Sequence, residues 1–185
     1  METFENTITI HRPAQEVFAF LADFENVPMW NYAIEKTWKT SPGPVGVGTA
    51  YRQTRSIPGR SEEGFEVTVF DPGERLAVQG QIGPFRAMIS YLLEADPGGT
   101  RLTNDVALDP LPGVLKLAAR LATPRVKAAV AENLSKLKEI LEAGNQRGGG
   151  FGRGGPVSTR GSLGRPRTRS PMMLRWISSV PPASR

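Results

Sequence analysis

Few residues in this 185-residue chain could do chemistry, and their types narrow the choice of reaction. The sequence has no cysteine, which excludes thiolate nucleophiles, cysteine-based zinc sites and disulfides. His11 is the single histidine, and we interpret it as a solvent-exposed residue at the end of a strand. The acidic pairs Glu62-Glu63 and Asp105/Asp109 lack the spacing of metal ligands, and no glycine-rich phosphate loop is present. We therefore expect neither a metal nor a cofactor.

Polar residues within predicted strands form a second group of candidates: Arg52, Arg55, Glu66, Arg86, Asn104 and Asp105. An arginine that faces a pocket can bind a carboxylate or an enolate, and a carboxylate or amide can orient protons. Glu66 and Asp105 alternate with apolar neighbours and are expected at the surface, whereas Asn104 shares the face of Val106. The alternation of the strand that contains Arg86 does not decide whether this side chain faces the pocket or the solvent.

Aromatic residues supply the remaining candidates. Trp30 follows the first predicted helix and is flanked by Met29 and Tyr32. It either lines a cavity and stacks on a ring or chain, or closes the core where two short helices meet a sheet. Tyr51 and Tyr91 would add hydroxyl groups to an apolar pocket.

The elements that position these residues lie in the first 144 residues. The whole chain has 23 basic and 18 acidic residues, a net charge of +5. The eight charged residues of 145–185 are all arginines, which leaves residues 1–144 with 15 basic and 18 acidic residues, a net charge of −3. We expect one folded domain over 1–144 and a disordered tail rich in Arg, Gly, Pro and Ser over 145–185. The net positive charge of the whole chain therefore gives no reason to expect that the folded part binds nucleic acid.

Residues 1–144 predict an α+β fold. Thr3–Ile10 alternates like a half-buried strand, Pro13–Phe24 has helical apolar spacing, and Pro28 starts a second short helix. Turn signals rich in Gly and Pro separate six further strands, expected at Glu35–Thr40, Thr49–Ile57, Glu63–Phe70, Arg75–Ile82, Phe85–Ala95 and Thr100–Leu108. Apolar residues every three or four positions then predict a long helix from Leu111 to Glu142, kinked or broken near Ala122–Thr123 by Pro124.

The strands are expected to form an antiparallel meander with one apolar face. Phe65, Val67 and Val69 alternate with polar residues and should share that face. A sheet that is apolar on one side only is covered on that side only. We expect the long C-terminal helix to provide the cover.

Four segments then become recognisable by their order: Arg12–Phe18, Val27–Trp30, Gly98–Thr103 and Leu134–Glu142. Over residues 3–143 the chain resembles the START-like (SRPBCC) superfamily, and more narrowly its bacterial polyketide cyclase/dehydrase branch. The resemblance implies a helix-grip fold, in which a curved seven-stranded antiparallel sheet wraps the long C-terminal helix around a largely apolar cavity. Some members bind lipids, hormones or aromatic polyketides, and a few catalyse cyclisation or dehydration. The superfamily shares the cavity rather than a catalytic set of residues.

We expect the cavity, between the sheet and the C-terminal helix, to bind a small hydrophobic or aromatic molecule. The predicted lining is Trp30, Tyr51, Phe65, Arg86, Met88, Tyr91, Asn104, Val106, Leu117 and Leu121. The alternative is a polyketide cyclase- or dehydratase-like enzyme that uses the same cavity. In that case Arg86 or Arg52 would polarise a carbonyl group and Asn104 would orient the substrate.

Two further expectations concern partners and location. The segment Gln146–Gly155 resembles RNA-binding RGG tracts, so RNA binding through the tail is a third hypothesis, although disorder without a dedicated function is favoured. No signal peptide is recognisable, and no apolar run approaches the roughly 20 residues of a membrane span. The cytoplasm is therefore the expected location, and the oligomeric state stays open.

Overall fold

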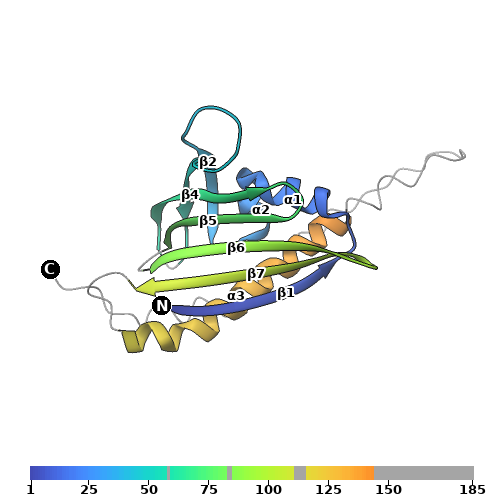
Figure 1. The fold of residues 1–185 in the computed structure, drawn as a ribbon. Coiled ribbons are helices and arrows are strands. Elements are labelled where there is room, and N and C mark those ends of the chain that lie inside the picture. Colours follow the sequence, from blue (N-terminus) through green and yellow to red (C-terminus); the bar gives the residue numbers. More distant parts are fainter. Residues whose placement is uncertain (58, 83–84, 111–115, 144–185) are drawn as a thin grey trace, which may run out of the picture.

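The computed structural model describes residues 1–57, 59–82, 85–110 and 116–143. In chain order the elements are β1 (Glu2–Ile10), α1 (Ala14–Ala22), the short 3-10 helix η1 (Phe24–Asn26), α2 (Val27–Trp30), β2 (Ile34–Lys39), β3 (Ala50–Arg55), β4 (Ser61–Asp71), β5 (Arg75–Ile82), β6 (Phe85–Asp96), β7 (Gly99–Pro110) and α3 (Lys116–Ala143) (Figure 1). The predicted α+β order is confirmed, with boundaries that differ by a few residues. Residues 144–185, including the predicted RNA-binding tract, lie outside the described residues.

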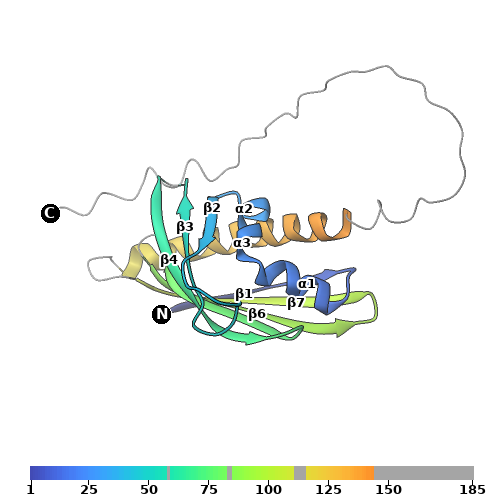
Figure 2. The same cartoon turned by 90° about the horizontal axis from the view of Figure 1, so that it is seen from above.

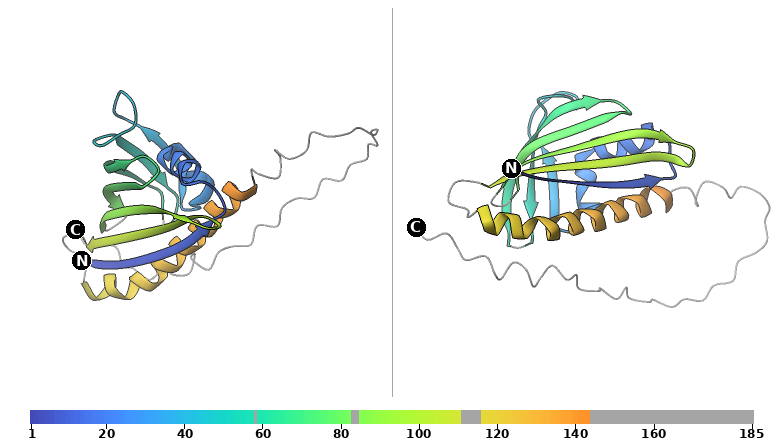
Figure 3. Two further views of the ribbon diagram at one scale, coloured as in Figure 1. Left: turned by 45° about the vertical axis from the view of Figure 1, so that its right-hand side comes forward. Right: turned by 60° about the horizontal axis from the view of Figure 1, so that its bottom comes forward.

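The strands form one antiparallel sheet in the order β1-β7-β6-β5-β4-β3-β2. Strands β2 to β7 follow one another as a meander, and β1 pairs along its full length with β7, from Glu2 opposite Leu108 to Ile10 opposite Thr100. The sheet curves, and α1, α2 and α3 all lie on its concave side (Figures 2 and 3). This arrangement confirms the predicted helix-grip fold.

A bulge in β4 changes which residues face the concave side. The pairing of β4 with β5 shifts between Val67 and Val69. Phe70 therefore packs against the core, where its ring meets that of Phe18 edge-on with centroids 5.2 Å apart. The predicted common face of Phe65, Val67 and Val69 is wrong beyond Val67, because an extra residue in one strand reverses the alternation that follows it.

Gly80 on β5 permits a close approach between strands. A Cβ atom at this position would lie 2.5 Å from both the Phe65 Cβ and the Gly64 carbonyl oxygen. The neighbouring Gly64 differs, because the nearest atom to its Cβ would be the Tyr51 carbonyl oxygen at 3.8 Å. Any side chain at position 80 would push β4 and β5 apart, so this close approach requires glycine.

On the concave face, α3 packs over β1, β7 and β6. Leu134 and Leu137 of α3 are 1% and 0% exposed and belong to the main core. A second cluster lies under the same helix and consists of Phe4, Phe85, Ala87, Val106 and Leu108, with Val126 and Val130 packed against it. A cavity lies on the same face, against β3, β4, β5 and β6.

The C-terminal end of α3 is fastened to the turn between β1 and α1. The backbone N–H of His11 donates to Glu142 Oε1 at 2.8 Å, and its ring Nδ1 lies at the same distance from that oxygen. Arg12 Nε donates to the Leu141 carbonyl at 2.8 Å, and Thr100 Oγ1 donates to the Arg12 carbonyl at 2.6 Å. These bonds satisfy groups at the helix end and fix α3 across the sheet.

α3 continues through Pro124 as one helix, so of the predicted kink or break near Ala122–Thr123 the break is wrong and the kink stays a prediction. Pro124 is exposed to solvent. The carbonyl group that loses its partner one turn earlier can bond water, so the helix tolerates the proline. The predicted start of this helix at Leu111 falls outside the described residues.

Candidate ligand cavity

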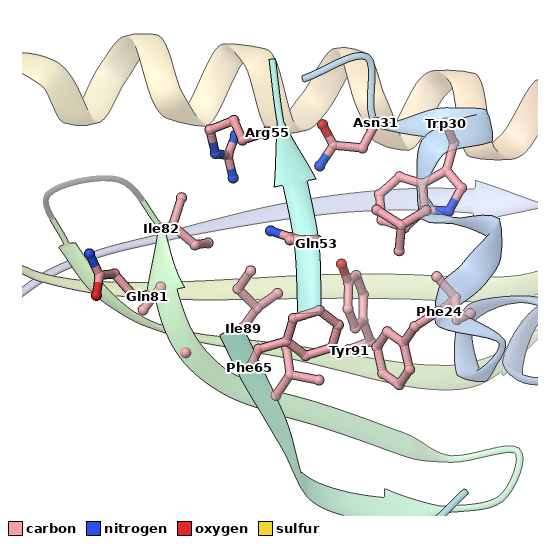
Figure 4. Close-up of a pocket in the computed structure, with 15 residues that line it drawn as sticks. Phe24, Trp30, Asn31, Gln53, Arg55, Phe65, Gln81, Ile82, Ile89 and Tyr91 are labelled. Atoms are coloured by element: carbon pink, nitrogen blue, oxygen red, sulfur yellow. The ribbon is translucent and has the colours of Figure 1, made fainter. Parts of the chain in front are cut away.

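A cavity opens between strands β3 to β6 and the segment that runs from α1 to α2 (Figure 4). The space that water-sized molecules can occupy in it is about 80 Å³, several times the ~10–15 Å³ that one water needs. Its described lining is Leu21, Phe24, Val27, Trp30, Asn31, Gln53, Arg55, Phe65, Val78, Gly80, Gln81, Ile82, Ala87, Ile89 and Tyr91. Gly80 and Ala87 are the smallest of these residues and leave room for the others.

Aromatic rings dominate the apolar wall. Phe24 of η1 lies 5.3 Å from Phe65 of β4 in an edge-on contact, and Trp30 and Tyr91 enter from α2 and β6 (Figure 4). Tyr51 is not part of the described lining, although it stacks on Phe65 with 5.3 Å between ring centroids and 9° between ring planes. Of the predicted lining, the structure therefore brings Trp30, Phe65 and Tyr91 together and places Tyr51 as a support.

The opposite edge of the cavity is polar and comes from β3 and β4. Arg55 Nε donates to Glu63 Oε1 at 2.8 Å, and Gln53 Nε2 donates to Glu63 Oε2 at 2.9 Å. The side chains of Arg55 and Glu63 are only 12% and 3% exposed. The Glu63 carboxylate thus binds a partner through each oxygen and orients two residues of the cavity edge.

Arg52 lies on the outer face of the sheet, so its predicted role in polarising a bound carbonyl is wrong. Its side chain pairs with Glu62, and the two side chains are 59% and 50% exposed. Arg52 fails to reach the cavity because alternate residues of a strand face opposite sides, and Gln53 on its C-terminal side faces inward. The inward arginine of β3 is Arg55.

Arg86 and Met88 also lie on the outer face, and their predicted place in the cavity is wrong. Both are exposed, Met88 to 49%. Ala87, Ile89 and Tyr91 occupy the inner face of β6, so the strand alternation itself excludes the residues between them. Met88 lines a separate depression on the outer side of β1, β7 and β6.

Asn104 and Val106 are buried, but they are not among the described lining residues of the cavity. Val106 belongs to the cluster under α3. Asn104 lies opposite Tyr91 and donates from Nδ2 to the Ser90 carbonyl at 3.2 Å, while its Oδ1 has no hydrogen-bond partner among the described residues. Both positions are therefore corrected. They belong to β7, which lies between β1 and β6, where α3 fills the concave face.

Leu117 and Leu121 belong to α3, but their side chains lie outside the described residues. The described lining contains no residue of α3 and comes instead from the sheet and from the α1 to α2 segment. Among the described side chains, the cavity is lined by the sheet and the α1 to α2 segment, and the predicted contribution of the C-terminal helix stays a prediction.

Burial keeps the tyrosines near the cavity protonated. Desolvation raises the pKa of the Tyr91 hydroxyl. Desolvation also raises the pKa of Tyr51, with a smaller contribution from Asp23 and Glu25. The Tyr91 phenol therefore stays neutral near pH 7 and keeps a proton that it can donate in a hydrogen bond.

Gln53, Glu63, Asn31 and Gln81 are the polar residues of this site that the sequence interpretation missed. A signal for the first two was present. Gln53 follows Tyr51 by two positions, and Glu63 precedes Phe65 by two, so both share the inward alternation of an aromatic residue already assigned to the cavity. No comparable periodic signal identifies Asn31, which lies just after α2.

None of the helices in the described ranges combines the length and hydropathy that a membrane crossing requires. No three histidine, aspartate or glutamate side chains in the same ranges are grouped so that they could hold a metal ion.

A curved sheet with three helices on its concave side and an internal cavity defines a helix-grip protein. A family model described as polyketide cyclase / dehydrase and lipid transport matches residues 1–142, and the chain belongs to this family. Uncharacterized proteins of Mycobacterium tuberculosis and Mycobacterium bovis are 30% identical to it over 148 residues, which cover 76% of this chain and 84% of theirs. The resemblance noted from the sequence is confirmed.

Solved structures share the fold at lower identity. The Zhui aromatase/cyclase of Streptomyces sp. R1128 is 18% identical, with a TM-score of 0.65 over 81% of this chain and 99% of that one. The di-domain aromatase/cyclase StfQ of the steffimycin biosynthetic pathway is 12% identical, with a TM-score of 0.66 over 78% and 51%. A protein of Thermus thermophilus is 18% identical, with a TM-score of 0.65 over 77% and 99%.

Proposed function

We propose that this protein binds a small molecule with an apolar or aromatic body in the cavity between β3–β6 and the α1 to α2 segment. One observation carries the proposal: rings from three separate parts of the chain surround an open space that a few polar side chains also line. Concave sites with apolar walls and a few placed polar groups are typical of small-molecule binding. The family, whose description includes lipid transport, supports the same function.

A neutral fluorescent probe tests this proposal on the full chain. N-phenyl-1-naphthylamine should bind with increased fluorescence, because the cavity would remove its rings from water. Ile82→Trp should abolish the increase, since Ile82 lines the cavity and a larger side chain there would fill it.

Met88→Trp is the matched control, because it adds the same ring to the outer face of the adjacent strand. It should leave probe binding unchanged. A probe that does not bind the wild type, or that is lost in the Met88 variant instead, contradicts the proposal.

A cyclase- or dehydratase-like reaction in the same cavity is a second candidate. It is favoured by two hydrogen-bond donors at the cavity wall, Arg55 and Tyr91, which could stabilise the oxygen of a substrate enolate. The test is incubation of the protein with a short poly-β-keto thioester and analysis of products by mass spectrometry. A cyclised product that has lost water, formed faster than in buffer and slowed by Tyr91→Phe, would support catalysis. Product at the buffer rate would contradict it.

A further inference from the structure

The outer face of the sheet lies opposite the cavity, and α1, α2 and α3 leave it uncovered because they all lie on the concave side (Figures 2 and 3). We propose that residues 165–176 of this chain dock on the outer face, with their arginines paired to Glu5 and Asp105 beside Met88. This contact goes beyond the proposed binding function, because it uses the other side of the sheet and does not depend on a ligand in the cavity.

The docking surface is a depression across β1, β7 and β6. The strand register arranges six of its residues in two rows, Thr3, Ala107 and Met88 in one and Glu5, Asp105 and Ser90 in the next. Ala107 and Ser90 carry small side chains, which leaves the surface hollow beside the longer Met88. The space that water-sized molecules can occupy in it is about 350 Å³, so it has room for side chains of a docked segment.

Two carboxylates at this depression lack a cation among the described residues. Glu5 and Asp105 lie directly opposite each other in the β1–β7 pairing, where like charges repel. Both side chains are exposed, and neither forms an ion pair with another described residue, whereas Glu94 on the same face pairs with Arg101. A cation placed between them would remove the repulsion, so the depression favours a basic occupant.

The C-terminal part of the chain supplies a basic segment. All eight charged residues of 145–185 are arginines, whereas residues 1–144 carry a net charge of −3. Arg165, Arg167 and Arg169 alternate with other residues, and in an extended backbone alternate side chains project to the same side. An arginine stem can pack on an apolar side chain while its guanidinium pairs with a carboxylate. The depression offers both kinds of group.

The apolar part of the same segment has a matching surface as well. Met88 and Leu92 are exposed to 49% and 38%, and both lie on the outer face of β6 on either side of Ser90. Apolar residues follow the three arginines closely in the sequence, namely Met172, Met173, Leu174 and Trp176. Covering the exposed apolar side chains of β6 would add hydrophobic stabilisation to the ion pairs.

The length of chain that follows α3 allows the segment to reach the depression. α3 ends at Ala143, next to Glu142, which is hydrogen-bonded to His11. Glu5 precedes His11 by six residues, about 20 Å along a strand. Residues 144–164 include nine glycines, and a glycine-rich chain of this length has a root-mean-square span of about 25 Å. The contact within one chain is favoured because this span matches the distance.

Paramagnetic relaxation enhancement in the full chain tests the contact. The sequence has no cysteine, so Ser170→Cys gives a single site for a nitroxide label beside the arginines. The backbone amide signals of Ser90, Asp105 and Ala107 should be broadened more strongly than those on the outer face of β3 and β4. Raising the ionic strength from about 0.1 M to about 1 M shortens the screening length from about 10 Å to about 3 Å and should weaken the broadening.

Two charge-matched variants of the labelled chain separate a local contact from a general attraction between opposite charges. Glu5→Gln/Asp105→Asn removes two negative charges from the depression and should abolish the broadening there. Glu62→Gln/Glu66→Gln removes two negative charges from exposed positions of β4 and should leave the broadening unchanged.

Two further samples identify the occupant. Arg165→Ala/Arg167→Ala/Arg169→Ala in the labelled chain should also abolish the broadening. A mixture of labelled chain without isotope enrichment and unlabelled, isotope-enriched chain detects contacts between copies, and it should show no broadening.

Absence of broadening in the labelled wild type overturns the inference, and binding of poly(U) RNA by the same sample would then give the arginines a different partner. Broadening spread evenly over the outer face, or broadening that survives Glu5→Gln/Asp105→Asn, also overturns it. Broadening in the mixture as strong as within one chain would assign the depression to the C-terminal segment of a second copy and overturn the contact proposed here.

Discussion

Two arginine–glutamate pairs join β3 to β4, and the sheet separates them. Arg52 and Glu62 meet on the outer face, with side chains 59% and 50% exposed, whereas Arg55 and Glu63 meet on the inner face, with side chains 12% and 3% exposed. Water screens the outer pair and competes for its hydrogen bonds. The inner pair is shielded and can orient donors toward a cavity. The comparison shows that the place in the strand alternation, and not the residue type, decides whether an arginine can serve a ligand.

The largest effect is expected from breaking the inner pair. Arg55→Met leaves the Glu63 carboxylate buried without its cation, which should lower the free energy of unfolding by about 3–5 kcal/mol. The double variant Arg55→Met/Glu63→Gln should regain most of that loss, because no unpaired charge remains. Urea denaturation of the two variants and the wild type measures both values. If Arg55→Met is as stable as the wild type, the prediction is wrong, and water must reach the inner pair.

The next effect concerns the glycine that lets β4 and β5 approach each other beside the inner pair. Gly80→Ala introduces a Cβ atom 2.5 Å from two atoms of β4 and should destabilise the protein by about 1–3 kcal/mol. Gly64→Ala is the control, since its Cβ would have only an ordinary contact at 3.8 Å. Thermal unfolding of both variants gives the comparison. Equal stability of the two would show that the strands relax apart without strain.

Glu142 lies between the two pairs in exposure, with its side chain 29% exposed. The hydrogen bond from the His11 backbone is the largest cause that lowers its pKa, so its stabilising contribution is present above the ordinary value of 4.5 and is lost as pH falls through the lowered pKa. The wild type should exceed Glu142→Gln in stability by about 1 kcal/mol or less at neutral pH, and this excess should vanish in acid. Unfolding measured across pH tests this. A stability difference between wild type and Glu142→Gln that grows as the pH falls would contradict the prediction.

The smallest effect is expected from the outer pair. Arg52→Met should change the free energy of unfolding by less than about 1 kcal/mol, and high salt should erase the difference. Urea denaturation at low and high ionic strength measures it. A loss as large as that of Arg55→Met would remove the distinction between the two faces.

The element order could be predicted from the sequence because turn residues and apolar periods are local signals. Trp30, Phe65 and Tyr91 could be predicted for the cavity wall, because aromatic residues bury a large area and tyrosine adds a hydroxyl group. The same alternation that placed Tyr51 and Phe65 inward also placed Arg55 and Glu63 inward. The prediction that Arg52 polarises a bound carbonyl rested on its residue type and did not take its position in the strand into account.

Other features depend on contacts that no local pattern contains. The bulge after Val67 reverses the inward face of β4, and it is set by the pairing with β5. The face of Arg86 follows only from the register of β6 between its neighbours. The described lining comes from the sheet and the α1 to α2 segment, and α3 packs against β1 and is held at its end by the His11 and Arg12 contacts.

The most direct test of a binding cavity inside the sheet uses two tryptophans as reporters. Trp30 lines the cavity, whereas Trp38 lies opposite Arg52 in the β2–β3 pairing and so shares the outer face. In a two-dimensional NMR titration of the full chain with 2-acetylnaphthalene, the indole N–H signal of Trp30 should shift and saturate while that of Trp38 stays in place. A saturating shift at Trp38 with Trp30 unchanged would put the ligand on the wrong face and contradict the account.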